Sequence, residues 1–258
     1  MKDKVVVITG ASSGIGAALA ERVAELGGLP VLAARREKEL AAVASRCGAK
    51  ALVVKGDMTR RADVQHVAQA AIARHGHIDV WVNNVGRGIT RLASELTDED
   101  VDEMMAVNVK SALYGAQAVL PHFKSRGAGH LINVSSVLGR VPFATVRSAY
   151  SAAKHFLNAM TAGLRVELRA THPGIHVSLV SPGVVATDFG LNALHGGADS
   201  RALPFAQPAR EVADVICSVI QTPRADVYTR PMFKEQVAAY YAAEDMGEAE
   251  QKPPFTRL

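Results

Sequence analysis

Short β-branched runs alternate with longer runs of helical period along almost the whole chain, and this alternation restricts the fold more than any other feature. Seven apolar runs predict strands at 4–9, 29–34, 50–57, 78–84, 129–136, 175–183 and 225–229. Helical periodicity predicts helices at 14–27, 36–47, 60–75, 97–106, 108–126, 148–171 and 207–222. Continuous apolar strands separated by helices are typical of a parallel sheet that is covered on both faces. Right-handed crossovers then predict an α/β, doubly wound, seven-stranded parallel sheet.

The length and composition fit one domain with a substantial core. The chain has 258 residues, of which 48% are hydrophobic and 21% charged. No linker divides it, so we expect a single domain over 1–258. The segment 184–206 is weakly patterned, and we expect it to form a substrate lid. The tail 231–258 follows the last predicted strand and is expected either to pack on a neighbouring subunit or to fray.

Charge, cysteine content and hydropathy exclude several classes of protein. The net charge is +4, but basic residues form only pairs and no patch, so nucleic-acid binding is not expected. The two cysteines, Cys47 and Cys217, show neither a disulfide framework nor metal-ligand spacing, and we expect no metal. The first predicted strand begins almost at the N-terminus, which leaves no signal peptide, and no apolar run is long enough to cross a bilayer. A cytoplasmic protein without membrane contact is expected.

A glycine-rich turn, T-G-A-S-S-G-I-G at 9–16, joins the first predicted strand to the first helix. Its G-x3-G-x-G spacing differs from the G-x-G-x-x-G dinucleotide fingerprint but has the same mechanics. Gly10 allows the tight turn, while Gly14 and Gly16 let the backbone approach a pyrophosphate. The following helix N-terminus attracts anions, and Ser12 and Ser13 add hydroxyl donors. The turn therefore predicts a dinucleotide site.

The end of the second predicted strand discriminates between the two nicotinamide dinucleotides. An acidic residue there binds the ribose of NAD, whereas a basic residue accommodates the 2′-phosphate of NADP. Ala34 occupies the acidic position, and Arg35 and Arg36 follow it. Because arginine suits phosphate recognition, we expect NADP(H) to be favoured over NAD(H).

Tyr150 and Lys154 lie four residues apart in a segment of helical period, and so share one helix face. A free tyrosine ionises near pH 10, and a nearby ammonium favours the phenolate. None of the other four tyrosines has lysine at this spacing. The pair therefore predicts an acid/base device, with Lys154 supplying the fixed charge.

Several short motifs follow one another in a defined order. They are T-G-x3-G-I-G at 9–16, Asp57, N-N-V-G at 83–86, Asn108, Ser136, Y-x3-K at 150–154 and Pro182-Gly183. In this order and spacing, the chain resembles the short-chain dehydrogenase/reductases over nearly its whole length. The resemblance implies a Rossmann-type domain and an NAD(P)-dependent oxidoreductase. It would reduce a ketone or aldehyde or oxidise the corresponding secondary alcohol.

The resemblance also implies roles for the matched positions. Tyr150 would act as acid/base, and Lys154 would also bind the nicotinamide ribose. Ser136 would donate a hydrogen bond to the substrate oxygen. Asn108 would hold a water on a proton path from Lys154 to solvent. The expected cofactor-binding residues are Gly10, Ser12, Ser13, Gly14, Ile15, Arg35, Arg36, Asp57, Met58, Asn83, Gly86, Tyr150, Lys154, Pro182, Gly183, Val185 and Thr187.

Within this set, the family places the Asp57 carboxylate near the adenine amino group. Val185 and Thr187 would bind the nicotinamide carboxamide. Asn83, at the end of the fourth predicted strand, either holds the backbone across the sheet, touches the ribose, or does both.

The sequence departs from the family pattern in two places. Val85 replaces the usual small residue of N-N-A-G, which predicts a slightly shifted cofactor contact. Ser136 lies fourteen residues before Tyr150, where thirteen is commoner. Only one of Ser135 and Ser136 can face the site, because neighbours in a strand point to opposite faces. Ser136 is preferred since S-V-L-G follows it, as the family pattern expects, with Ser135 as the alternative.

Substrate contacts are expected from the loop after Ser136 and from the lid. The pocket residues expected there are Leu138, Phe143, Val146 and Phe189, with Val141, Leu191 and Leu194 as further candidates. Their apolar character predicts a hydrophobic small-molecule ketone or alcohol, while Arg140, Arg147 and His195 are candidates for recognising a polar group. The resemblance implies a homodimer or homotetramer formed through the helices at 108–126 and 148–171. Alternative activities are reduction of a carbon–carbon double bond, epimerisation, or non-catalytic dinucleotide sensing.

Overall fold

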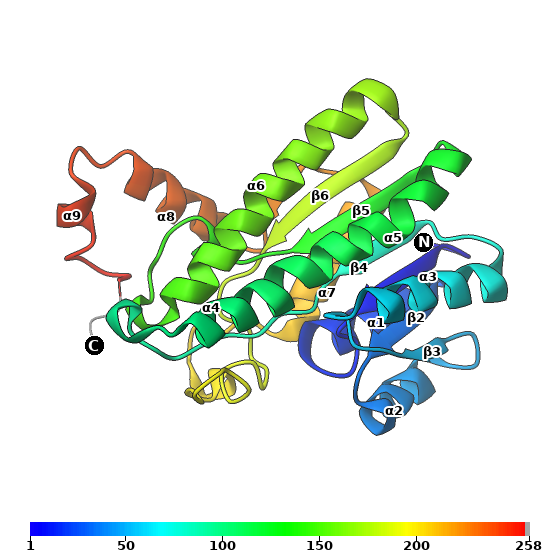
Figure 1. The fold of residues 1–258 in the computed structure, drawn as a ribbon, viewed down its shortest axis with the longest axis horizontal. Coiled ribbons are helices and arrows are strands. Elements are labelled where there is room, and N and C mark those ends of the chain that lie inside the picture. Colours follow the sequence, from blue (N-terminus) through cyan, green and yellow to red (C-terminus); the bar gives the residue numbers. More distant parts are fainter. Residues whose placement is uncertain (256–258) are drawn as a thin grey trace.

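The apolar runs form strands whose two faces are both covered, as the continuous hydrophobic pattern requires. The computed structural model describes residues 1–255. The strands are β1 (Val5–Thr9), β2 (Leu29–Ala34), β3 (Leu52–Lys55), β4 (Val80–Asn83), β5 (Gly129–Val134), β6 (Ile175–Ser181) and β7 (Asp226–Tyr228). All neighbours pair in parallel, in the order β3-β2-β1-β4-β5-β6-β7 (Figure 1). The predicted doubly wound, seven-stranded sheet is confirmed.

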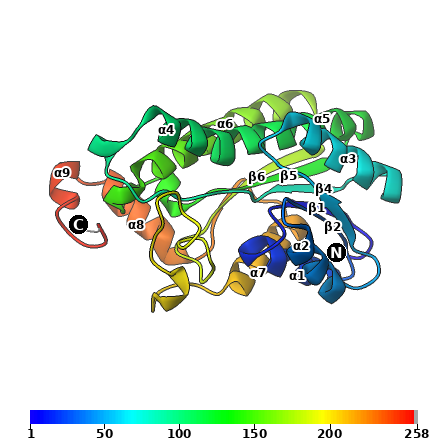
Figure 2. The same ribbon diagram turned by 60° about the horizontal axis from the view of Figure 1, so that its bottom comes forward.

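Helices cover both faces of the sheet (Figure 2). Their buried side chains form two hydrophobic cores, one on each face. One face carries α1 (Gly14–Glu25), α2 (Glu37–Cys47) and α7 (Ala209–Gln221). The other carries α3 (Arg61–His75), α4 (Asp98–Met105), α5 (Ser111–Arg126) and α6 (Ser148–Thr171). Successive side chains of β1 point to opposite faces of the sheet. Val6 and Ile8 pack with the first group of helices, and Val5 and Val7 pack with the second.

Most helix bounds lie within two residues of those predicted, and the differences have local causes. The first helix ends at Glu25 rather than 27 because Gly27 takes a left-handed conformation with φ of +79°. Pro208 at the N-cap delays α7 to Ala209. The short 3₁₀ turns are η1 (Ala93–Glu95), η3 (Val137–Gly139), η4 (Thr145–Arg147) and η5 (Ser200–Ala202).

The two helices predicted at 97–106 and 108–126 are joined without a break. A π-helical turn, η2 (Ala106–Lys110), connects α4 to α5. Thr97 and Asp100 form a reciprocal capping box at the start of α4. The π turn contains Asn108, and such turns occur frequently at functional sites.

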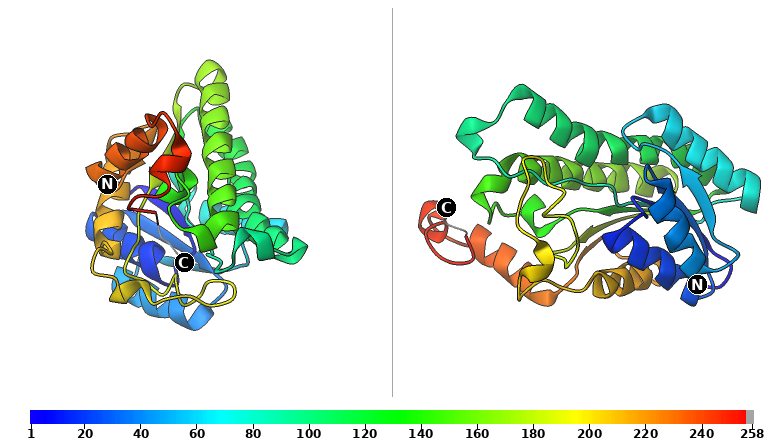
Figure 3. Two further views of the ribbon diagram at one scale, coloured as in Figure 1. Left: turned by 90° about the vertical axis from the view of Figure 1, so that its left-hand side faces the viewer. Right: turned by 90° about the horizontal axis from the view of Figure 1, so that it is seen from below.

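The tail folds back onto its own chain at the carboxyl end of the sheet. It contains α8 (Pro231–Tyr241) and α9 (Met246–Ala249). Val237 and Tyr240 are buried with Val141, and the Tyr241 hydroxyl donates to the Arg140 carbonyl at 2.6 Å. Figure 3 shows the tail and the loop between β6 and α7 at the same end of the molecule. The last residues of the predicted extension, 256–258, lie outside the described residues.

Candidate active site

The turn between β1 and α1 has the geometry that its glycines suggested. Gly10 and Gly14 adopt left-handed φ angles of +68° and +56°, which side chains disfavour. A methyl group added to Gly16 would collide with the Gly10 carbonyl oxygen. Ile15 follows in the first turn of α1, partly buried against the core. The turn is thus a backbone cradle at a helix N-terminus, where unpaired amide groups favour an anion.

The two arginines after β2 take different positions. The Arg36 guanidinium donates to the hydroxyls of Ser12, at 3.1 Å, and Ser13, at 2.7 Å. Arg35 instead lines a hollow of about 310 Å³ together with Asp57 and other residues near the carboxyl ends of β2 and β3. The structure therefore brings Arg36 to the glycine turn and leaves Arg35 beside the neighbouring hollow.

Asp57 and Met58 form the turn that leaves β3. The Asp57 carboxylate accepts hydrogen bonds from the backbone and hydroxyl of Thr59 at 2.9 and 2.8 Å. Its own amide donates to the carboxylate of Asp63, and Met58 is buried. These bonds hold the Asp57 side chain at the border of the hollow that Arg35 lines.

Asn83 ends β4 and Asn84 follows it, and their side chains have different partners. The Asn83 amide donates to the Ala112 carbonyl and to Asn133, and its oxygen accepts from the Trp81 indole. This buried side chain ties β4 to β5 and α5, which is the cross-sheet role and leaves its amide protons no capacity for a ribose. Asn84 instead donates to the Thr9 and Gly10 carbonyls at the glycine turn.

Tyr150 and Lys154 lie in the first turns of α6, and both are buried. The Lys154 ammonium donates to the Val134 carbonyl at 3.0 Å and lies 5.7 Å from the centre of the Tyr150 ring. Ser136 follows β5, and its hydroxyl lies close enough to the phenol to lower the phenol pKa. The hydroxyl of Ser135 donates instead to Asn158, so Ser136 is the serine that faces Tyr150.

Burial dominates the electrostatics of this group. It raises the pKa of Tyr150 to about 12, against the opposing effects of the Ser136 hydroxyl and the Arg147 charge. Burial also lowers the pKa of Lys154 to about 8. The sequence interpretation assigned the fixed positive charge beside the phenol to Lys154, and in the structure a second cation, Arg147, also acts to lower the Tyr150 pKa. Arg147 lies three residues before Tyr150, about one helical turn, and this spacing is the sequence signal that could have identified it.

Asn108 connects the π turn to the loop that follows β4. Its side-chain oxygen accepts from the Arg87 amide, and its amide donates to the Arg87 and Met104 carbonyls. A methyl group added to Gly86 would lie 3.2 Å from the Asn108 oxygen and 3.6 Å from the Lys154 nitrogen. Gly86 therefore lies against both of the polar side chains that the sequence assigned to the proton path.

The segment after β6 returns to the glycine turn. A methyl group added to Gly14 would lie 3.1 Å from the Thr187 methyl group. The Pro182 carbonyl accepts from the Val137 amide, next to Ser136, and Val185 is buried in the core beside α1. Gly183 faces the ring of Phe233, which leaves no room for a side chain. The segment 182–187, in which the resemblance implied nicotinamide contacts, therefore runs between Ser136 and the glycine turn.

The predicted substrate pocket is only partly assembled. Leu138 and Phe189 pack in the cluster around Tyr150, with the Phe189 ring edge-to-face to the phenol at 5.6 Å between centres. Phe143 lies elsewhere, in the cluster formed with the tail, where its ring is 5.1 Å from that of Phe255. The structure therefore does not bring Phe143 into the cluster around Tyr150. Val146 is only partly buried, and its carbonyl accepts from the Arg91 amide.

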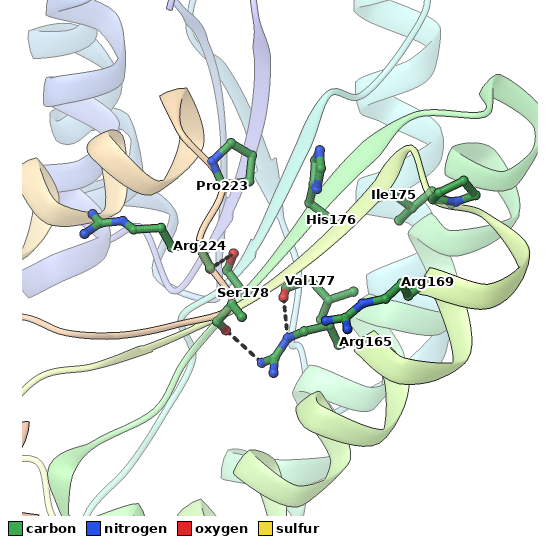
Figure 4. A pocket seen from close by; sticks show the side chains of 10 residues that line it. Arg165, Arg169, Ile175, His176, Val177, Ser178, Pro223 and Arg224 are labelled. Atoms are coloured by element: carbon green, nitrogen blue, oxygen red, sulfur yellow. Dashed lines mark hydrogen bonds between the residues drawn. The ribbon is translucent and has the colours of Figure 1, made fainter.

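A separate hollow of about 160 Å³ lies near the amino end of β6, away from Tyr150. In Figure 4, the Arg165 guanidinium donates to the Val177 and Ala225 carbonyls, with Arg169, His176 and Arg224 nearby. Among residues 1–255, no helix combines the length and apolar character needed to cross a bilayer. Within the same residues, no cluster of three or more acidic, histidine or cysteine side chains is suited to a metal ion.

Comparison with known proteins places the chain in a family. Residues 4–195 match the sequence model of the short chain dehydrogenases. The chain belongs to the short-chain dehydrogenase family. An uncharacterized oxidoreductase of Staphylococcus epidermidis is 38% identical over 196 residues, covering 74% of this chain and 84% of the relative. Oxidoreductase chemistry is therefore the class of activity that the family indicates.

Solved structures of the family share the fold. A short-chain dehydrogenase/reductase from Burkholderia phymatum, crystallised with NAD, is 27% identical with a TM-score of 0.86, covering 100% of this chain and 98% of its own. A serine dehydrogenase complexed with NADP⁺ is 26% identical with a TM-score of 0.81, covering 88% and 95%. The family resemblance predicted from the motifs is confirmed.

Proposed function

We propose that this short-chain dehydrogenase is an NADP(H)-dependent oxidoreductase that interconverts a ketone or aldehyde with the corresponding alcohol. The observation that carries the proposal is the buried group of Tyr150, Ser136 and Lys154 at the carboxyl end of the sheet. The segment after β6 connects this group to the glycine turn, because Thr187 lies against Gly14 and Pro182 bonds beside Ser136. Ligands of open α/β sheets bind at this edge.

The residues of the turn fit a nicotinamide dinucleotide. The backbone of the turn is accessible to a ligand because it carries no side chains at Gly10, Gly14 and Gly16. The N-terminus of α1 favours a pyrophosphate. Arg36 and the Ser12 and Ser13 hydroxyls form a cationic, hydrogen-bonding group beside the turn, which would accommodate the 2′-phosphate of NADP. Solved relatives contain NAD in one case and NADP⁺ in another. When bound, such a cofactor would supply or accept the hydride.

The acid/base work would fall to this chain's own side chains. With a pKa of about 12, the Tyr150 phenol is protonated at neutral pH and is poised to give its proton to a carbonyl oxygen. The Ser136 hydroxyl would donate a hydrogen bond to the same oxygen. The Lys154 ammonium, positioned by the Val134 carbonyl, would stabilise the phenolate that remains.

NADPH consumption measured against ketones, aldehydes and enones, with identification of the products, tests this proposal. We expect alcohols from the ketones or aldehydes, and a lower rate when NADH replaces NADPH. Saturated carbonyl products formed from enones alone would show instead a carbon–carbon double-bond reductase. Tight NADPH binding without turnover on any member of the panel would contradict the proposed function.

A further inference from the structure

Arg147, whose charge lowers the Tyr150 pKa, is a cation at the start of α6 that no acidic side chain balances among the described residues. It is the N-cap residue of α6, three residues before Tyr150. A cation at a helix N-terminus is repelled by the helix dipole, so this position does not stabilise the helix. The Arg147 side chain instead reaches Gly88 in the loop after β4, where a methyl group would collide with its Nη1.

Within the described residues, the Arg147 guanidinium has no hydrogen-bond or ion-pair partner, and its Nη1 is shielded from water. The Thr90 hydroxyl is likewise buried without a partner in that part of the chain. A methyl group added to Gly197 would lie 3.1 Å from both Arg147 Nη2 and Thr90 Oγ1. Two unsatisfied polar groups therefore border the same small region.

Asp100, the acidic residue bonded to Arg91, already has two side-chain partners. Asp100 is buried, with one carboxylate oxygen accepting from Arg91 at 2.8 Å and the other lying 2.6 Å from His195 Nε2. Arg147 is partly buried, and shielding a cation from water without a counter-ion is costly; burial also lowers the Arg147 pKa below its ordinary value. The missing negative charge is therefore expected from a bound molecule.

The surroundings of Arg147 place that molecule at the substrate end of the site. Gly88, which Arg147 contacts, also lies against Phe189, whose ring packs on Tyr150. The phosphate-binding features, by contrast, are the glycine turn and Arg36. Phe189 and Gly197 both belong to the expected lid, so movement of this segment would uncover the guanidinium.

We propose that Arg147 and Thr90 bind a carboxylate of the substrate, which makes the substrate an oxo acid or the corresponding hydroxy acid. The inference rests on the proposed carbonyl–alcohol activity and names its substrate class. A guanidinium offers a planar pair of donors that matches a carboxylate, and the threonine hydroxyl adds one more. One positive charge suits a monoanion better than a dianionic phosphate ester.

A series of oxo acids and their methyl esters tests the proposal, since each pair differs in charge and little else. The series is 2-, 3- and 4-oxopentanoate, each compared with its ester by kcat/KM. Wild type should prefer at least one acid over its ester by about 10-fold or more, in line with hydrogen bonds to charged groups. Arg147→Met should abolish this preference, and Arg147→Lys should keep part of it. Arg169→Met, an exposed arginine on the same helix, serves as the matched control and should leave the ratio unchanged.

A wild-type enzyme that prefers every ester, or an Arg147→Met variant with an unchanged ratio, would overturn the proposal. Calorimetric titration with pentanoate and with pentanamide, in the presence of NADP⁺, tests the carboxylate site independently of the proposed activity. Pentanoate binding that disappears in Arg147→Met, combined with no turnover of any carbonyl, would uphold the carboxylate site and reject the activity. Turnover of neutral ketones without pentanoate binding would uphold the proposed activity and reject the carboxylate site. Arg147→Lys supplies the comparison if the methionine variant does not fold.

Discussion

Tyr150 lies in an environment that opposes its ionisation more than it assists it. Burial raises the phenol pKa to about 12, and the Ser136 hydroxyl and Arg147 charge offset only part of this effect. In this state the residue is an acid with its proton in place. A base would require additional positive charge near the phenol, which an oxidised nicotinamide ring provides.

Replacement of Tyr150 by phenylalanine removes the proton donor while keeping the ring against Phe189. We expect turnover to fall roughly 10²- to 10⁴-fold, the usual contribution of general acid–base catalysis. Dinucleotide binding, followed by fluorescence titration, should persist. Tyr241→Phe, which removes an exposed hydroxyl bonded to the Arg140 carbonyl, should leave turnover near wild type. Comparable rates in the two variants would reject the role of Tyr150.

We expect the pH dependence of carbonyl reduction to follow the ionisation of Lys154. Its pKa is lowered to about 8 by burial, so the charge is present below pH 8 and is lost above it. Because the phenol stays protonated in this range, kcat/KM for reduction should be level below pH 8 and fall at higher pH. Profiles from pH 6 to 10 measure this, and Lys154→Met should lack the descending limb. A wild-type profile that stays level to pH 10 would contradict the assignment.

Arg36 predicts the cofactor preference, because its guanidinium bonds to both serines of the glycine turn. Arg36→Gln removes the charge but keeps a hydrogen-bonding side chain. We expect the ratio of kcat/KM for NADPH over NADH to fall about 10-fold or more, the scale of a charged hydrogen bond. Arg35→Gln should change the ratio less, since Arg35 lines the adjacent hollow. Equal ratios in wild type and Arg36→Gln would place the 2′-phosphate elsewhere.

At the scale of elements, the expected lid is joined to the rest of the fold by a few specific contacts. The Leu194 amide donates to the Gly88 carbonyl, and the Thr90 amide donates to the Leu194 carbonyl. Asp100 in α4 binds both Arg91 and His195, and contact with His195 followed by Arg91 holds the pKa of its carboxyl below the ordinary value. A carboxyl with a depressed pKa stabilises the fold above its unfolded-state pKa, and this contribution is lost as the pH falls.

Asp100→Asn should loosen the lid without removing the α4 cap, because an amide oxygen can still accept from the Thr97 backbone. We expect amide hydrogen exchange in 188–197 to accelerate about 10-fold, matching the loss of a charge-assisted bond. Exchange in β1 should not change. Asp102→Asn, an exposed neighbour on the same helix, is the control. Unchanged protection of 188–197 in Asp100→Asn would show that the Asp100 contacts do not hold this segment.

At the scale of the whole molecule, the outer face of α6 carries an apolar stripe. Phe156 is 49% exposed and Val166 is 67% exposed, with Ala152, Ala159 and Gly163 between or beside them on the same face. Large exposed apolar groups with small neighbours are suited to close helix–helix contact. We propose that α6 contributes to a homodimer or homotetramer interface, as the family resemblance suggested.

Light scattering tests this assembly directly. Wild type should have a mass of at least two chains, and Phe156→Glu combined with Val166→Glu should shift the population towards the monomer. The buried charge that these substitutions would create at an interface is strongly unfavourable. Glu167→Gln, on the same exposed helix, should leave the mass unchanged. A wild-type monomer at all concentrations would contradict the proposal.

The sequence by itself determined the order of strands and helices, the glycine turn and the pairing of Tyr150 with Lys154. These features depend on periodicity and on spacings of a few residues, which local backbone geometry converts directly into structure. The family pattern favoured Ser136 but kept Ser135 as an alternative, and the sequence left open whether Asn83 holds the sheet, touches the ribose or does both.

Only the tertiary structure decided which residues meet across the fold. It placed Asn83 inside the sheet, Arg36 on the serines, Phe143 against the tail, and the Arg147 guanidinium against Gly88. It also determined how far burial moves the pKa values of Tyr150 and Lys154. Contacts between distant segments and removal from water depend on how helices and loops pack around the sheet, and no short stretch of sequence encodes that packing.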